Sequence, residues 1–344
     1  MKHFLGFVSV IFLSLTLLYL YKDDGTGHIS DSMSLKVYGS SSFIGSWGPG
    51  PALKEIFEKQ NGIKVTYLEM ADPSLVIQKI SFEGKQAVGD VILSIDQYDV
   101  ARISDKLAWK IIDIKNDLKL NSQLSGIYKN EYFKPYDWSP LSFVARNQLE
   151  VSIEKLDDLL KPELKGRIAL EDPRTSSPGL NFLSWVFKNK SPADAEIFLK
   201  RLIPQLHSVS PSWSAAYGLF KNKQVDIVLS YVTSPIYHLV EENDPHFKSL
   251  EFKEEHPIQV EFAAVPDTCQ NCEAGIKFVE FLQTAEAQRI IMEKNYMFPI
   301  KKNVQEGTAF DGVKIFKTIP FQFENKDTLQ KWLNIWSELR NNES

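Results

Sequence analysis

Cysteine is scarce in this sequence, with two residues among 344, and neither sign of charge prevails strongly. So few cysteines exclude a disulfide scaffold. The 39 basic and 44 acidic side chains give a formal charge of −5, which argues against a nucleic-acid-binding protein. A hydrophobic share of 43% supports a packed core and excludes wholesale disorder. A chain of this length is expected to form two lobes.

Signatures of common enzyme classes are also missing. The chain has no G-x-S-x-G nucleophile elbow, no G-x-x-x-x-G-K-[ST] phosphate loop and no H-E-x-x-H metal pair. The six histidines are scattered, and Asp172 beside Arg174 reads as a structural turn pair. We therefore expect a protein that is not an enzyme, with no cofactor and no metal site. An exported hydrolase of phosphate esters stays as an alternative, which turnover of a phosphorylated substrate would distinguish.

Residues 4–21 are almost wholly apolar and uncharged, with Lys2 before them and Lys22 after them. An N-terminal run of this kind is typical of an export signal or a membrane anchor. No small-x-small cleavage pattern stands before Lys22, which favours an uncleaved anchor. We predict that residues 1–27 are a signal peptide or an anchor in the inner membrane, and that the remaining chain lies in the periplasm.

The two cysteines are close together, at Cys269 and Cys272. An oxidising compartment favours a structural disulfide between them. A zinc site would need two further ligands with suitable spacing, and a redox-active pair would need its own strand and helix signature, so both stay as less favoured alternatives.

Short apolar runs alternate with helical patterns, which predicts an α/β fold with largely parallel strands. Strands are expected at 35–38, 63–68, 90–95, 167–170 and 226–231, and helices at 51–60, 73–82 and 180–188. The extended segments 132–145 and 258–265 are candidate hinge strands. Residues 28–135 with 266–344 would then form one lobe and residues 136–265 the other, with a ligand cleft between them.

Small hydroxyl side chains and aromatic residues gather at three turns that lead from a strand into a helix. The turns are 40–42, 175–177 and 233–234. Backbone amides at a helix start favour an anion there, although ordinary capping explains any single turn. Trp213, Tyr217, Tyr231 and Tyr237 stand near these turns and could form walls for a flat or cationic ligand.

Four segments carry a resemblance to a known family. They are Trp47-Gly-Pro-Gly-Pro51, Glu171-Asp-Pro-Arg-Thr-Ser-Ser-Pro-Gly-Leu180, Trp213-Ser-Ala-Ala-Tyr-Gly-Leu-Phe220 and Asp226-Ile-Val-Leu-Ser-Tyr-Val-Thr-Ser-Pro-Ile-Tyr-His238. In this order they resemble the thiamine-binding periplasmic proteins of ABC importers. The resemblance implies a type II periplasmic-binding-protein fold, with two α/β lobes joined by hinge strands and a ligand cleft between the lobes. It also implies capture of thiamine or thiamine phosphates and their delivery to an ABC transporter permease.

The resemblance also assigns ligand contacts, residue by residue. The matching positions are Asp72, Ser176, Ser177, Trp213, Tyr231, Val232, Thr233, Ser234 and Tyr237. Trp213 and Tyr237 would lie against the rings and the thiazolium cation, and the hydroxyls and amides of the serines would donate to a phosphate or hydroxyethyl oxygen. Asp72 would bond the aminopyrimidine or offset the positive charge.

The chain departs from the family pattern in three places. Ser40 and Ser41 stand where the family has a tyrosine and an aspartate, Pro73 stands where it has glycine, and Tyr296 replaces a tryptophan. Ser41 and Tyr296 are additional site candidates. A lost stacking partner would weaken binding by about 1 kcal/mol. The departures leave open the same fold with another small cation or heterocycle, such as a polyamine or ferric ion.

Overall fold

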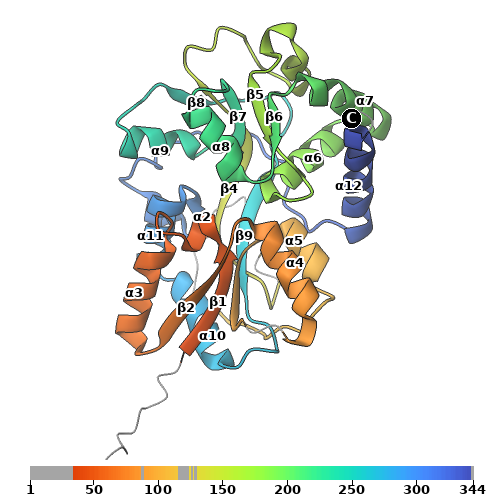
Figure 1. Cartoon of the computed structure of the whole chain (residues 1–344). Helices are drawn as coiled ribbons and strands as arrows, with labels where there is room; N and C mark the ends of the chain where they lie inside the picture. The colour runs from red at the N-terminus through yellow and green to blue at the C-terminus, as the bar shows by residue number, and fades with distance from the viewer. Residues whose placement is uncertain (1–33, 87–88, 115–123, 125–126, 128–129, 342–344) are drawn as a thin grey trace, which may run out of the picture.

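The computed structural model describes residues 34–86, 89–114, 124, 127 and 130–341. Within these ranges the chain forms two α/β lobes, one above the other, with the strands β4 (Lys134–Arg146) and β9 (Ile258–Ala264) running between them (Figure 1). Strands and helices alternate as the hydrophobic pattern predicts, so the predicted fold class is confirmed. The apolar segment 4–21 lies outside the described residues, and no helix inside them is long and apolar enough to cross a membrane.

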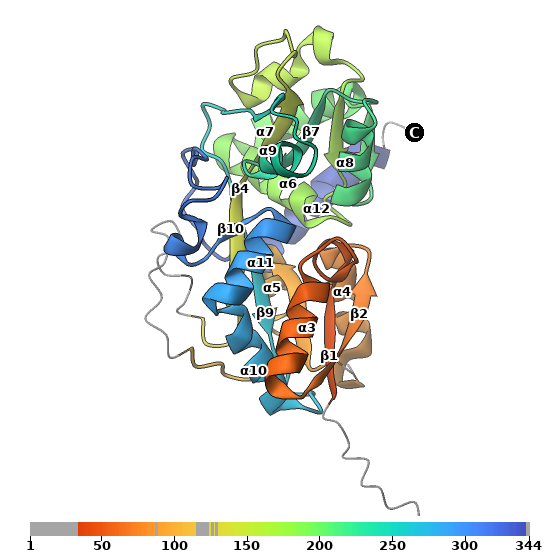
Figure 2. The same cartoon turned by 90° about the vertical axis from the view of Figure 1, so that its left-hand side faces the viewer.

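The first lobe is a sheet with helices on both faces (Figure 2). β1 pairs in parallel with β2 and β3, and β9 and the first half of β4 continue the sheet in antiparallel fashion. Its other strands and its helices are β1 (Ser34–Ser40), β2 (Lys64–Met70), β3 (Val91–Asp96), β10 (Phe298–Pro299), α2 (Ser41–Ile44), α3 (Gly50–Asn61), α4 (Pro73–Glu83), α5 (Gln97–Ile103), α10 (Cys272–Leu282) and α11 (Ala285–Asn295).

Alternation along β1 explains why both faces of this sheet are covered. Leu35 and Val37 pack with the apolar side chains of α3, α10 and α11, whereas Tyr38 packs with those of α4 and α5. Successive side chains of a strand point to opposite faces, so an apolar run buries both. Gly62 ends α3 in the left-handed conformation at φ 68°, as its position just past the predicted helix requires.

The second lobe repeats the same layering. β5 pairs in parallel with β6 and β7, and β7 and β8 pair in antiparallel fashion with the second half of β4. Helices α6 and α7 pack on one face of this sheet and α8 on the other. The elements are β5 (Ile168–Glu171), β6 (Ser208–Ser210), β7 (Ile227–Tyr231), β8 (Phe247–Ser249), α6 (Ser177–Asn189), α7 (Pro192–Leu202), α8 (Trp213–Lys221) and α9 (Ser234–Glu241).

β4 belongs to both sheets and so forms the core of the hinge. Its residues from Lys134 to Pro140 pair with β9, whereas those from Leu141 to Ala145 pair with β7. The backbone amide of Leu141 donates to the carbonyl of Pro257, 2.8 Å away, where the chain returns toward β9. The two predicted hinge segments therefore lie side by side between the lobes.

The terminal helix α12 (Lys326–Asn341) runs beside both lobes, against α7 of the second lobe and α5 of the first (Figure 1). Leu329, Trp332 and Trp336 are buried and form an apolar stripe at the i, i+3, i+7 spacing of one helix face, and Trp332 stacks on Phe187 of α6 at 5.4 Å between ring centroids. The predicted boundaries assign this helix to the first lobe; its apolar side chains pack in one cluster with those of α6 and α7 in the second lobe and with Tyr98 of α5 in the first. The stripe marks a docking helix without indicating which lobe it covers.

Cys269 and Cys272 form a disulfide at the start of α10. The Asp90 carboxylate also holds this turn, because its Oδ1 accepts the amides of Gln270 and Asn271, each at 2.8 Å. The disulfide closes a very short loop, so replacing both cysteines by serine should lower the free energy of unfolding by only about 2 kcal/mol. Urea unfolding of the double variant measures this, and a loss of the folded state would contradict it.

Candidate functional site

A cavity of about 740 Å³ lies between the lobes. The first lobe contributes the start of α4 and the loop before α3, the second lobe contributes α8 and α9, and β9 contributes the floor. The polar and aromatic lining includes Trp47, Asp72, Trp213, Tyr217, Lys221, Tyr231, Ser234, Tyr237, Glu241, Gln259, Glu261, Lys294, Asn295 and Tyr296. This composition suits a small ligand that carries rings and a charge.

The structure brings together a little over half of the residues that the sequence singled out. Asp72, Trp213, Tyr231, Ser234 and Tyr237 line the cavity, and so does the additional candidate Tyr296. The lining does not include Ser41, Ser176, Ser177, Val232 or Thr233. The first group comes from both lobes, so a ligand in the cavity would contact both.

One wall of the cavity is built on α8. Trp213 and Tyr217 stand one helical turn apart and stack at 4.8 Å between ring centroids, with 24° between their planes. The indole Nε1 of Trp213 donates to Ser230 Oγ at 2.9 Å, and the Tyr217 hydroxyl lies 2.9 Å from His238 Nε2. Burial lowers the pKa of His238, and its Nδ1 lies 2.6 Å from Glu242. Both rings are thus fixed before any ligand binds.

A second aromatic surface comes from α9 and the end of α11. Tyr237 and Tyr296 meet edge to face, with centroids 5.4 Å apart and an interplanar angle of 86°. The Tyr296 hydroxyl donates to Glu241 Oε1 at 2.6 Å. The ammonium of Lys221 donates to the Tyr237 hydroxyl and lies 4.5 Å from the centre of that ring. These contacts hold the rings at the rim of the cavity.

Asp72 caps the N-terminus of α4 and faces the second lobe. Its Oδ1 accepts the Ser74 amide at 3.2 Å. Burial, together with the nearby charge of Asp99, raises the pKa of Asp72 to about 7, although the amide bonds counteract part of this. A cation beside Asp72 would favour the ionised carboxylate, so the group suits a positively charged ligand.

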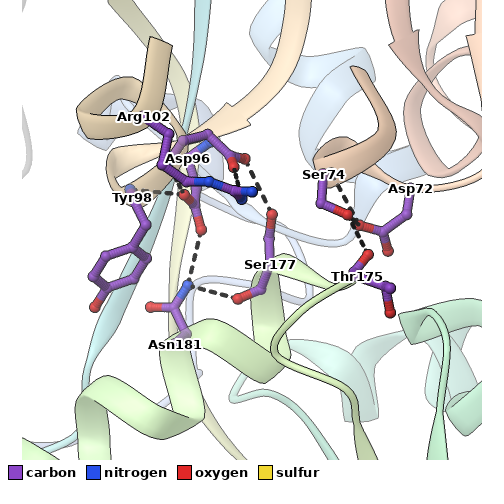
Figure 3. A network of polar contacts seen from close by, with 9 residues as sticks. Asp72, Ser74, Asp96, Tyr98, Arg102, Thr175, Ser177 and Asn181 are labelled. Carbon is purple, nitrogen blue, oxygen red and sulfur yellow. Dashed lines mark hydrogen bonds and ion pairs between the residues drawn. The ribbon is translucent and has the colours of Figure 1, made fainter. Parts of the chain in front are cut away.

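Ser177 instead lies in the contact between the lobes (Figure 3), and Ser176, just before it, is buried as well. The Ser177 hydroxyl donates to Asp99 Oδ2 of α5 at 3.2 Å. The Ser176 hydroxyl is buried and has no hydrogen-bond partner among the described residues. Beside them, the Ser74 hydroxyl donates to the Thr175 carbonyl across the same contact. Ser177 and Ser74 therefore position the start of α6 against the first lobe.

The turn after β7 divides its hydrogen-bonding groups between the hinge and the cavity. The amide of Val232 donates to Pro140 at 3.1 Å, and the Thr233 hydroxyl lies 3.3 Å from Ser139 Oγ, so both residues bond to β4. Ser234 Oγ accepts the Tyr231 amide at 3.2 Å. Ser41 is not a lining residue itself, but its hydroxyl donates at 3.1 Å to the carbonyl of Ala71, which lines the cavity.

The sequence interpretation missed several lining residues. Trp47 is 52% exposed at the cavity and opens one of the four segments that carry the family resemblance, but it is not among the predicted ligand contacts. Glu261 lies within the apolar strand 258–264, and a charged residue inside a buried strand is a signal that could have been used. No sequence motif points to Lys221, Glu241 or Lys294, because only the fold brings them to the rim of the cavity.

The described part of the chain holds no group of three or more histidine, cysteine, aspartate or glutamate side chains arranged for a metal ion. The lobed α/β fold and its interlobe cavity define the class of solute-binding proteins. The family model for bacterial extracellular solute-binding proteins matches residues 35–296.

Comparison with individual proteins indicates a narrower family than the family model does. A thiamine-binding periplasmic protein of Brucella abortus is 33% identical over 310 residues, which cover 88% of this chain and 90% of the relative. The protein of the same name from Escherichia coli is 31% identical over 306 residues, covering 88% and 92%. The solved structure of a periplasmic thiamin binding protein matches with a TM-score of 0.82 and 30% identity, covering 89% and 96%. The chain therefore belongs to the bacterial extracellular solute-binding proteins and, within them, to the family of the thiamine-binding periplasmic proteins.

More distant structures share the fold alone. Apo ferric ion-binding protein A of Pasteurella haemolytica matches with a TM-score of 0.74 but at 18% identity, covering 89% of this chain and 98% of that one. The predicted type II periplasmic-binding fold agrees with these neighbours.

Proposed function

We propose that this protein captures thiamine or a thiamine phosphate in the interlobe cavity and delivers it to the permease of an ABC importer. The observation that carries the proposal is the cavity itself, where the fixed ring pair Trp213 and Tyr217 and the pair Tyr237 and Tyr296 stand near the carboxylate of Asp72. Aromatic faces attract a cationic ring by about 0.5–2 kcal/mol each. The similarity to thiamine-binding proteins supports the same ligand.

The proposed ligand contacts follow from this lining. Trp213, Tyr231 and Tyr237 would contact the rings, Asp72 would face a positive or amino group, and the Ser234 hydroxyl would bond a polar substituent. Ser177 would act through the interlobe contact, and Val232 and Thr233 through the hinge, so that they position the lining residues. The buried Ser176 hydroxyl, which has no partner among the described residues, would be free to bond a ligand that reaches it. The protein would then be a carrier and not an enzyme.

The remaining proposals concern location and domain limits. The relatives are named periplasmic, and we place this protein in the periplasm, with residues 1–27 as its signal peptide or its anchor in the inner membrane. We assign residues 28–135 and 266–325 to the first lobe and residues 136–265 to the second. Helix α12 would join the two lobes, because its apolar side chains pack with α6 and α7 of the second lobe and with α5 of the first.

Calorimetric titration of the purified protein with thiamine, thiamine phosphate, thiamine diphosphate and spermidine tests the proposed function. We expect at least one thiamine compound to bind with submicromolar affinity, and spermidine to bind far more weakly, because spermidine offers no flat ring to the aromatic walls. A folded protein that binds spermidine or ferric ion but no thiamine compound would contradict the proposal. Turnover of the phosphate esters would favour the hydrolase instead.

A further inference from the structure

The hinge strands carry a row of buried carboxylates beneath the cavity. In the sheet register, Glu261 of β9 lies directly opposite Asp96 of β3 on one side and Asp137 of β4 on the other. All three are buried, with exposed fractions of 7%, 1% and 0% respectively. Of the three, Glu261 lines the cavity. Buried carboxylates this close to one another repel unless a proton or a cation intervenes.

Hydrogen bonds hold Glu261 and Asp137 as a pair. Asn295 donates from one amide nitrogen to both, at 2.7 Å to Asp137 Oδ2 and 3.4 Å to Glu261 Oε2. The Tyr136 hydroxyl donates to Glu261 Oε2 at 2.8 Å, and the Ser94 amide in turn donates to that hydroxyl. Asp137 Oδ1 is buried without a hydrogen-bond partner in the described structure. The pair is thus fixed in place but incompletely satisfied.

The positive groups of the lining do not neutralise this floor. Lys221 lies 3.1 Å from Glu242, and Lys294 lies 3.7 Å from Glu241, so each rim lysine is already paired with an acid at the rim. No lysine or arginine ion pair reaches Glu261 among the residues described. The cavity therefore has a balanced rim and a negative floor.

We propose that Glu261, supported by Asp137, is the counter-charge that selects a positively charged ring in this cavity. The inference rests on the proposed function and extends it, since it names the residue that favours the thiazolium cation over a neutral ring. The cation would supply the charge that the carboxylate pair lacks, and Tyr231, which lines the same cavity, would cover one side of it.

The pKa of Glu261 predicts in which direction the affinity for a cationic ligand changes with pH. Burial raises the pKa of Glu261 to about 6, against the bonds from Tyr136 and Asn295, which lower it. A bound cation favours the ionised form, so binding should release a proton and tighten as the pH rises from 5 to 7. The titratable and charged groups around Glu261 are Asp72, Asp96, Asp99, Tyr136, Asp137, Glu171, Tyr231, Lys294 and Tyr296.

The test compares wild type with Glu261→Gln and Asp137→Asn. Thiamine is titrated by calorimetry from pH 5 to pH 8, in two buffers that differ in ionisation enthalpy, so that proton release is measured directly. Glu273→Gln is the matched control, because it removes the same charge at an exposed position of α10. Near-ultraviolet circular dichroism checks that each variant is folded.

We expect wild type to bind at least roughly 10-fold more tightly at pH 7.5 than at pH 5 and to release protons on binding, because Glu261 and Asp72 both have raised pKa values and both line the cavity. Glu261→Gln should lose the part of this pH dependence that comes from Glu261, which leaves the part that comes from Asp72, and should release fewer protons than wild type. It should bind about 10-fold more weakly at pH 7.5, whereas Glu273→Gln should match wild type. The neutral thiazole alcohol should bind wild type and Glu261→Gln alike. A folded Glu261→Gln variant with the affinity and pH profile of wild type would contradict the proposal that Glu261 is the counter-charge, but not the proposed function. If wild type bound no thiamine compound, the proposed function would fall, and this inference with it.

Discussion

Trp213→Ala is expected to weaken thiamine binding by about 10- to 100-fold, because it removes a ring face that the structure holds rigid. Tyr217 stacks on one side of the indole and Ser230 fixes its Nε1, so little conformational entropy remains to be lost when a ligand binds. Removing the side chain loses both the area and the cation–π attraction. Titration calorimetry measures the change, and tryptophan quenching by thiamine should fall to the part that comes from Trp47, which also lines the cavity.

Two further variants separate the ring face from the indole bond. Trp213→Phe keeps a flat face but loses the bond to Ser230, so we expect a loss of less than about 10-fold. Trp109→Phe is the matched control, because this indole packs on Phe133 in the first lobe and does not line the cavity. Unchanged affinity in Trp213→Ala would show that the ligand does not contact this wall.

The layered fold could be predicted because local signals agree with it. The apolar runs at 35–38 and 90–95 became β1 and β3, and Pro51 and Gly62 marked the start and end of α3. The two extended segments that were expected as hinges pair with one another. The position of α12 could not be predicted, because an amphipathic stripe shows that a helix is buried without naming its partner.

The cavity was predictable where family motifs lie and not elsewhere. Trp213 and Tyr237 follow from such segments, whereas Glu261 comes from β9, which returns to the site more than 100 residues after Asp137. The roles of serines at helix starts are harder to predict from the sequence. Ser177 stands at a helix start that would suit an anion, yet the structure uses its hydroxyl to join the lobes. Spacing along the chain does not distinguish a ligand donor from an interlobe donor.

The contact between the lobes is organised by Asn181 of α6 (Figure 3). This buried amide donates to Asp96 Oδ2 at 3.1 Å and to Gln259 Oε1 at 3.0 Å, and it accepts from Gln97 at 3.3 Å. It thus joins the second lobe to the start of α5 and to the hinge strand β9. Burial raises the pKa of Asp96 well above its ordinary value, because the charged carboxylate has lost its hydration. Each hydrogen bond donated to Asp96 therefore offsets part of the cost of burying it.

Asn181→Leu is therefore expected to lower the free energy of unfolding by about 3–5 kcal/mol, since an apolar side chain of similar size leaves buried oxygens on Asp96 and Gln259 without this donor. Urea unfolding measures the loss. Asn189→Leu on the same helix is the control, because its amide bonds only backbone carbonyls at a half-buried position, and we expect about 1 kcal/mol there. Asn181→Leu should also weaken the contact between the lobes, so the arrangement of the lobes that binds ligand should become less populated. Thiamine affinity should therefore fall as well. Equal stability of the two variants would show that the lobes are held by other contacts.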